Sequence, residues 1–195
     1  TMSATMSTID TSALSLGDVV VTGKGAKQIP LFVGHGDSVT WTPRDSLPVL
    51  FEPSAFNDAS ASRVNLCLSV TPATAECLHG FDEWCVNTLA LESQRLFGAT
   101  LSVEDVRARF QPMLRTHEAS GSQSLRVKLS LAGRSRVRLW DTAKNPISQP
   151  PSWTQCTAKL KIRLKAIWLM GKADMGVLAE ASDIMLDDAE ADCPF

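Results

Sequence analysis

The chain contains no tyrosine and only three histidines, and several patterns that mark enzymes and membrane proteins are missing from it. No apolar run approaches the ~18 residues that a membrane-spanning helix needs, so no contact with a membrane is predicted. The sequence has neither a Walker phosphate loop nor a nucleophile elbow, and "GKGAK" at 23–27 lacks the spacing of a phosphate-binding loop. We therefore do not predict an enzyme.

Cysteine usage points to a reducing compartment. The five cysteines are odd in number, scattered and without a CxxC pair: Cys67, Cys77, Cys85, Cys156 and Cys193. Because the N-terminus is polar and carries no signal peptide, we expect reduced thiols and an intracellular protein. The spacing of Cys77, His79 and Cys85 matches no usual zinc finger, so neither a metal nor another cofactor is expected.

The charge of the chain is divided very unevenly. The net charge is −2, yet 12 of the 19 basic residues lie between Arg115 and Lys172, where only Glu118 and Asp141 oppose them. From Ala173 to Phe195 there are seven acids and no base. A cationic body is therefore followed by an anionic segment, and the small net charge does not exclude a polyanionic partner.

The first 70 residues read as a polar arm followed by short strands. Residues 1–13 are predicted to be a flexible arm, and a single domain is expected over 14–186, since 195 residues with 44% hydrophobic content can bury one core. Short apolar runs separated by Gly, Pro and Asp predict strands and turns. The stretch 63–70 alternates apolar and polar residues, which indicates a half-buried strand.

Residues 81–115 change to a helical period. We predict one helix over about 81–97, with acids in its first turn and Gly98 as its stop. A second helix is predicted over about 102–115, because Ser102 and Asp105 have the spacing of a capping box.

From residue 124 the pattern returns to strands, and these strands are strongly basic on one side. Because side chains alternate along a strand, their cations should share one surface. The predicted nucleic-acid-binding cations are Arg126, Lys128, Arg136, Arg138, Lys159, Lys161, Arg163 and Lys165. Such a row favours a phosphate polymer and salt-sensitive binding, although a merely solubilising face is the alternative.

Binding of single-stranded nucleic acids also requires aromatic rings on which bases stack, and tryptophans can supply them. Trp140 lies in register with Arg136 and Arg138, and Trp153 lies in a polar loop where a core position is disfavoured. Both are predicted to stack. Trp168 has the apolar parity of its strand, so we expect it in the core unless a bulge shifts the register.

The segment "LDDAEADCPF" points to one class of polyanion-binding proteins. It resembles the acidic C-terminal tip of single-stranded-DNA-binding proteins, which in the bacterial family ends in Asp residues and Pro-Phe and in the T7-like phage family ends in acids and Phe. The matching residues are Asp187, Asp188, Glu190, Asp192, Pro194 and Phe195. Cys193 departs from the pattern, which has a bulky aliphatic residue there, and alanines dilute the acids.

The body at 124–195 also resembles OB-fold proteins of this class from phages and large DNA viruses. The resemblance implies a mainly β, antiparallel, OB-fold-like barrel with a two-helix insertion at about 81–115 and a flexible acidic tail at 187–195. It also implies sequence-independent single-stranded DNA binding in replication, recombination or repair, with a tail that recruits replication or repair proteins. Three alternatives for partners stay open: a role as an assembly subunit that docks an acidic protein, RNA binding, and self-association.

Overall fold

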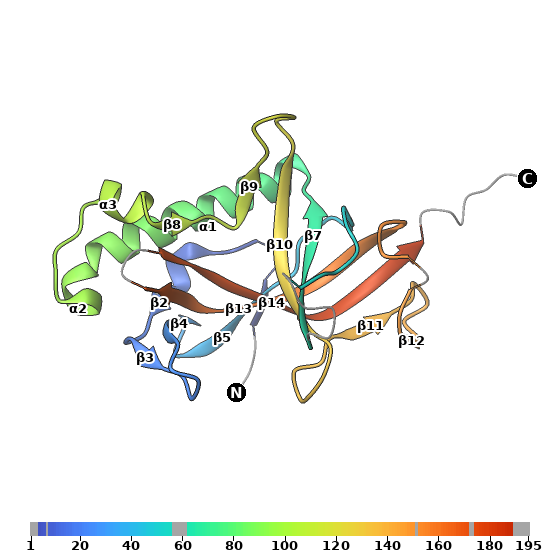
Figure 1. Ribbon diagram of the computed structural model, residues 1–195, viewed down its shortest axis with the longest axis horizontal. Helices are drawn as coiled ribbons and strands as arrows, with labels where there is room; N and C mark the ends of the chain where they lie inside the picture. The colour runs from blue at the N-terminus through green and yellow to red at the C-terminus, as the bar shows by residue number, and fades with distance from the viewer. Residues whose placement is uncertain (1–3, 7, 56–61, 151, 172–173, 189–195) are drawn as a thin grey trace, which may run out of the picture.

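The computed structural model describes residues 4–6, 8–55, 62–150, 152–171 and 174–188. One curled sheet runs through this part of the chain, and helix α1 lies along one side of it (Figure 1). Its main path is, in order, β1 (Ala4–Met6), β5 (Asp37–Trp41), β4 (Lys27–Val33), β13 (Cys156–Met170), β14 (Asp174–Asp188), β10 (Gln123–Ser130) and β7 (Arg63–Ser69).

Short strands extend this path at its edges. They are β2 (Leu14–Leu16), β3 (Val20–Val21), β6 (Leu47–Pro48), β8 (Phe110–Gln111), β9 (Leu114–Thr116), β11 (Arg138–Trp140) and β12 (Pro146–Ile147). The sheet is mainly antiparallel, but β1 pairs with β5, and β8, β10 and β11 pair with β14, in the parallel sense. The predicted antiparallel arrangement therefore holds for most strand pairs, and these four pairings are the parallel exceptions.

Part of the segment predicted as a flexible N-terminal arm forms regular secondary structure. Within 1–13, residues Ala4–Met6 pair with β5, and Thr11–Ala13 form a short 3-10 helix that Asp10 caps. Asp187 and Asp188, which were predicted to belong to the flexible tail, belong to β14 and pair with Thr157 and Cys156.

The long hairpin of β13 and β14 forms the centre of the sheet, and two bulges interrupt its register. Lys161 pairs with Asp183 and Ile162 pairs with Ala181, so Ser182 is an extra residue in β14. Leu164 pairs with Ala179 and Ala166 pairs with Leu178, so Lys165 is an extra residue in β13. Each bulge changes which side chains beyond it face outward.

The helices start and end differently from the prediction. α1 (Pro72–Leu91) begins nine residues before Phe81, at a Thr71 N-cap followed by Pro72, and is followed by α2 (Ser93–Phe97). Asp82 and Glu83 therefore lie inside α1, not in its first turn. Gly98 ends α2 with φ 69°, and Ser102 and Asp105 form the predicted capping box, but α3 (Val103–Arg107) is only five residues long.

The core lies between the sheet and α1. The apolar residues of the alternating strands are buried as predicted; they include Val64, Leu66, Leu68, Leu125, Val127, Leu129, Ala158, Leu160, Ile162 and Leu164. The basic stretch 134–140 follows the prediction only in part. Arg134 lies in a turn after Gly133 (φ 74°), and the strand itself is confined to Arg138–Trp140.

None of the helices in the described ranges is both long and apolar enough to cross a lipid bilayer.

Candidate functional site

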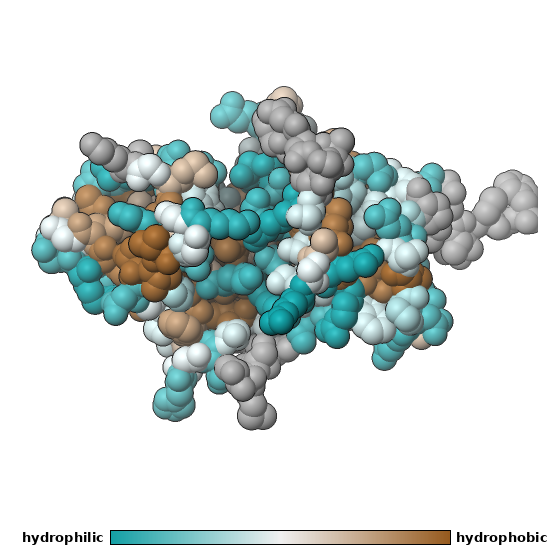
Figure 2. Space-filling view, turned by 60° about the horizontal axis from the view of Figure 1, so that its bottom comes forward, coloured by the Kyte–Doolittle hydropathy of each residue, from teal (hydrophilic) through white to brown (hydrophobic). Residues whose placement is uncertain are grey.

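Neighbouring strands bring the predicted cations onto one outward face, which we call the cationic face. Its centre is a row of paired residues: Lys128 on β10, Glu180 on β14 and Arg163 on β13. A second row joins Arg138 on β11, Asp183 on β14 and Lys161 on β13. Because paired residues point to the same side of a sheet, these side chains share a surface. Figure 2 shows hydrophilic side chains crossing the middle of one side of the molecule, between hydrophobic areas.

Two carboxylates lie among these cations. Glu180 is 4% exposed, and its Oε2 is 2.9 Å from Arg63 Nη2 and 3.5 Å from Lys165 Nζ. The long cationic side chains around Glu180 cover it, and it holds two of them in place. A purely cationic surface was expected here, so the face is less positive than the strand pattern of β10 and β13 predicted.

Asp183 connects the cations to Trp140. Its carboxylate is 2.8 Å from Arg138 Nε and accepts a hydrogen bond of 3.2 Å from Trp140 Nε1. Partial burial raises the pKa of Asp183, but hydrogen bonds from Arg138, Ser182 and Trp140 outweigh that effect, so its pKa lies below the ordinary value. The Arg138 guanidinium also lies 6.0 Å from the Trp140 ring centre, within range of a cation–π contact. The indole is therefore fixed in orientation.

Two hollows lie next to each other on the cationic face. One, of about 370 Å³, is mostly apolar, and Trp140, Lys144, Lys159 and Lys161 are among the residues that line it. The other, of about 280 Å³, is polar and contains four arginines together with Ser135, Glu180 and Ser182: Arg134, Arg136, Arg138 and Arg163. An apolar ring beside a guanidinium cluster suits a ligand that combines flat bases with phosphates.

Most of the predicted cations are available to such a ligand. Arg126, Arg136, Arg138, Lys159, Arg163 and Lys165 are exposed, and Lys128 and Lys161 are half-buried. Burial, and after it the charges of Arg63 and Arg126, lowers the pKa of Lys128. An anion in contact with this cluster would relieve that repulsion.

The interpretation of Trp153 as an exposed stacking ring is wrong. Its side chain is 6% exposed and belongs to the core. Glu52 holds the surrounding loop inward, because its Oε1 accepts hydrogen bonds from the backbone N–H groups of Trp153 (2.9 Å) and Thr154 (3.2 Å). A polar loop sequence did not reveal this anchor, since Glu52 is about 100 residues away in the chain.

The predicted site lacked four residues of the cationic face: Arg63, Lys144, Glu180 and Asp183. Arg63 had a usable signal, because it has the outward parity of 63–70. Glu180 and Asp183 had none, because they are three positions apart and only the Ser182 bulge brings both to the same face.

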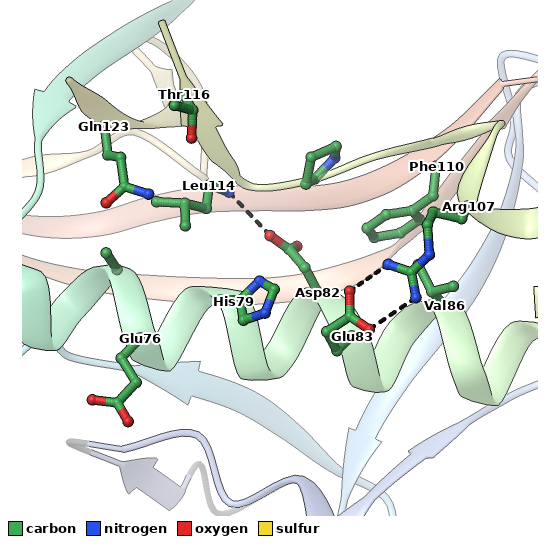
Figure 3. A pocket seen from close by; sticks show the side chains of 12 residues that line it. Glu76, His79, Asp82, Glu83, Val86, Arg107, Phe110, Leu114, Thr116 and Gln123 are labelled. Atoms are coloured by element: carbon green, nitrogen blue, oxygen red, sulfur yellow. Dashed lines mark hydrogen bonds and ion pairs between the residues drawn. The ribbon is translucent and has the colours of Figure 1, made fainter. Parts of the chain in front are cut away.

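A separate cavity of about 520 Å³ lies between α1 and the β8–β9 segment (Figure 3). Three of its charged groups, Asp82, Glu83 and Arg107, are already paired. Asp82 accepts hydrogen bonds from the backbone N–H groups of Met113 (2.9 Å) and Leu114 (3.1 Å), and Glu83 forms a two-pronged ion pair with Arg107. Burial raises the pKa of Asp82 to about 6, although both backbone hydrogen bonds oppose the rise. These contacts attach α1 to β9 and α3, so the cavity is a structural junction.

Within the described part of the chain, His, Cys, Asp and Glu residues nowhere gather in a group of three that could hold a metal ion. Cys67, Cys77, Cys85 and Cys156 form no disulfide with one another.

Of the predicted partner-binding residues, Asp187 is exposed at the end of β14 and Asp188 is the last residue of that strand. Glu190, Asp192, Pro194 and Phe195 lie outside the described residues.

Comparison with known solved structures shows the fold. No family model matches the sequence, and no curated protein matches it. Among solved structures, the chain is similar to gp2.5, a single-stranded DNA-binding protein encoded by bacteriophage T7, with TM-score 0.52, 10% identity, and coverage of 76% of this chain and 91% of that one. It also matches the single-stranded DNA-binding protein of bacteriophage Enc34 in complex with single-stranded DNA, with TM-score 0.44, 10% identity and coverage of 89% and 92%. The likeness to the T7 protein confirms the mainly β, OB-fold-like architecture.

Proposed function

We propose that this protein binds single-stranded DNA without sequence preference, through the cationic face. The observation that carries the proposal is the joining of β10, β14, β13 and β11 into one surface, where exposed cations surround a fixed indole. The cations would contact phosphates, and Trp140 would stack on a base. Backbone phosphates and base faces are common to every sequence, so these contacts do not distinguish one sequence from another.

The fold supports this proposal independently. The T7 protein that shares it is a single-stranded DNA-binding protein, although an identity of 10% carries only the fold. Fold alone does not determine function, so the proposal depends on the residues of the cationic face. No step of bond making or breaking is needed, and binding is the whole of the proposed activity.

We further propose that the protein acts in replication, recombination or repair, and that the acidic segment 189–195 has two roles there. It would compete with DNA for the cationic face, and it would present Phe195 to replication or repair proteins. Removal of 189–195, which leaves β14 whole, should tighten DNA binding at low salt and abolish partner recruitment. The matched variant Glu190→Gln/Asp192→Asn keeps the length of the segment and should tighten DNA binding alone. Unchanged DNA affinity in both variants would refute the competition.

The direct test of DNA binding is fluorescence anisotropy. A labelled single strand of ~30 nucleotides, long enough for an OB-fold site, is titrated beside a duplex and an RNA of the same length at two salt concentrations. Tight, salt-sensitive binding to the single strand and weak binding to the duplex are expected. Equal binding to RNA would widen the proposal to single-stranded nucleic acids. No binding at low salt, even after removal of 189–195, would overturn the proposal.

A further inference from the structure

The bulge at Lys165 moves Trp168 out of the core. Before the bulge, Ile162 and Leu164 face inward; after it, Ile167 faces inward with 0% exposure and Trp168 is half-buried. Trp168 therefore lies on the outward side of β13, the side that carries Arg163 and Lys165. The prediction that Trp168 lies in the core is therefore wrong. The Lys165 bulge shifts the register of β13, which is the exception stated with that prediction.

The Trp168 indole rests on a glycine that its position requires. Trp168 pairs with Gly176 on β14, and a Cβ on Gly176 would lie 2.7 Å from Trp168 Cζ2 and 2.9 Å from Cε2. The ring therefore covers the outward side of Gly176, and a methyl group there would push it away. Because one side of the ring rests on the strand, its exposure comes from the side that faces away from the sheet.

Exposed apolar side chains lie in the rows around Trp168, although its direct partner on β4, Gln28, is polar. Trp168 pairs with Gln28 on β4, and Gln28 pairs with Val20 on β3, so the three residues form one row across the strands. Val20 is 40% exposed. Met170, two residues beyond Trp168, is 67% exposed. Figure 2 shows a hydrophobic area at the end of the molecule that carries β3 and α2 in Figure 1. The cationic face thus continues into an apolar platform with an aromatic ring.

Trp140 and Trp168 lie at the two ends of a row of cations along β13, and we call this row with its two tryptophans the track. Trp140 pairs with Met185, which pairs with Lys159, so Trp140 is level with the first cation of β13. From Lys159 to Trp168 the strand runs nine residues, or about 30 Å of chain. The cations Lys161, Arg163 and Lys165 lie between.

We propose that Trp168 is a second base-stacking residue, and that the single strand follows β13 from Trp140 to Trp168. This inference rests on the proposed function and adds the path and the far end of the site. A flat ring held on a glycine backbone, at the end of a row of cations and beside exposed apolar side chains, fits a nucleobase attached to the phosphates that the cations bind.

The test compares variants on oligothymidylates near both limits of OB-fold site size, about 5 and about 16 nucleotides. On the long strand, Trp168→Ala should weaken binding at least about fivefold, the lower limit for loss of one stacked base, and Trp168→Phe should recover part of it. Gly176→Ala should also weaken binding, because it displaces the ring without changing its chemistry. On the short strand, which can remain at the Trp140 end, the effect of Trp168→Ala should be smaller.

Leu91→Ala is the matched control, because Leu91 is 86% exposed at the end of α1, away from the cationic face, and its removal should change nothing. Thermal unfolding of each variant checks that the fold is retained. If the wild type binds no single strand, the proposed function fails. If the wild type binds and Trp168→Ala binds equally well on the long strand, only the track is refuted. Self-association that Trp168→Ala abolishes, with unchanged DNA affinity, would make the platform a protein contact and also overturn the track.

Discussion

The charge of Arg163 provides a quantitative test of the cationic face. Arg163 is exposed in the middle of the face, between Glu180 on β14 and Thr40 on β5, and no ion pair to it occurs within the described ranges. Its guanidinium is therefore free to neutralise a phosphate. Arg163→Gln removes the charge, keeps a long polar side chain and leaves the strand pairing in place.

The expected size of the effect follows from counterion release. On a single strand, each neutralised phosphate contributes about −0.7 to the slope of log K against log salt concentration. Arg163→Gln should therefore make the slope shallower by about 0.7. At about 0.1 M salt this corresponds to about fivefold weaker binding, and the difference should shrink toward about 1 M.

The assay is anisotropy of a labelled single strand at several salt concentrations. Arg44→Gln is the control, because it removes the same charge from an exposed site beside the N-terminal end of α1. Its slope should equal that of the wild type. Equal slopes for wild type and Arg163→Gln would refute the assignment of phosphate contact to β13. Equal changes of the slope in both arginine variants would show that the effect depends only on the net charge of the protein.

Two further predictions concern the buried carboxylates. Glu180→Gln removes the partner of Arg63 and Lys165, which are both partly exposed, so the free energy of unfolding in urea should fall by only about 1 kcal/mol while affinity for single strands rises. A fall in affinity without unfolding would contradict this. Burial raises the pKa of Asp82 from 3.8 to about 6 in the folded protein. The contribution of this carboxyl group to stability is therefore complete below the unfolded-state pKa of 3.8, and it is lost as the pH rises through the folded-state pKa of about 6. Wild-type stability should therefore decline by up to about 3 kcal/mol between about pH 4 and pH 7, relative to Asp82→Asn. Parallel pH profiles would refute the raised pKa.

Local alternation was enough to predict the basic strands. Hydrophobic residues two apart fixed the inward side of β10 and β13, and this alternation depends only on strand geometry. The cap at Ser102 and the stop at Gly98 were also readable, because both are local backbone requirements. The start of α1 could have been predicted too, since Thr71 and Pro72 form an N-cap with proline in the first turn.

The missed features depend on pairing between distant segments. The two bulges of the β13–β14 hairpin exist only in the register of two strands, and they decide that Glu180, Asp183 and Trp168 face outward. The burial of Trp153 depends on Glu52, and the extension of β14 to Asp188 depends on its pairing with Cys156. The sequence of one β-strand, taken by itself, contains no information about its pairing with distant segments.

The measurement that tests the central claim most directly is a map of photochemical cross-links. A single strand of ~16 nucleotides that contains iodouracil is bound, irradiated and digested, and the cross-linked aromatic residues are identified by mass spectrometry. The account predicts cross-links at Trp140, which lies on the cationic face beside Lys159 and Lys161. Cross-links confined to Trp84 on α1, with Trp140 unmodified, would place the nucleic acid on the helical side and contradict the account.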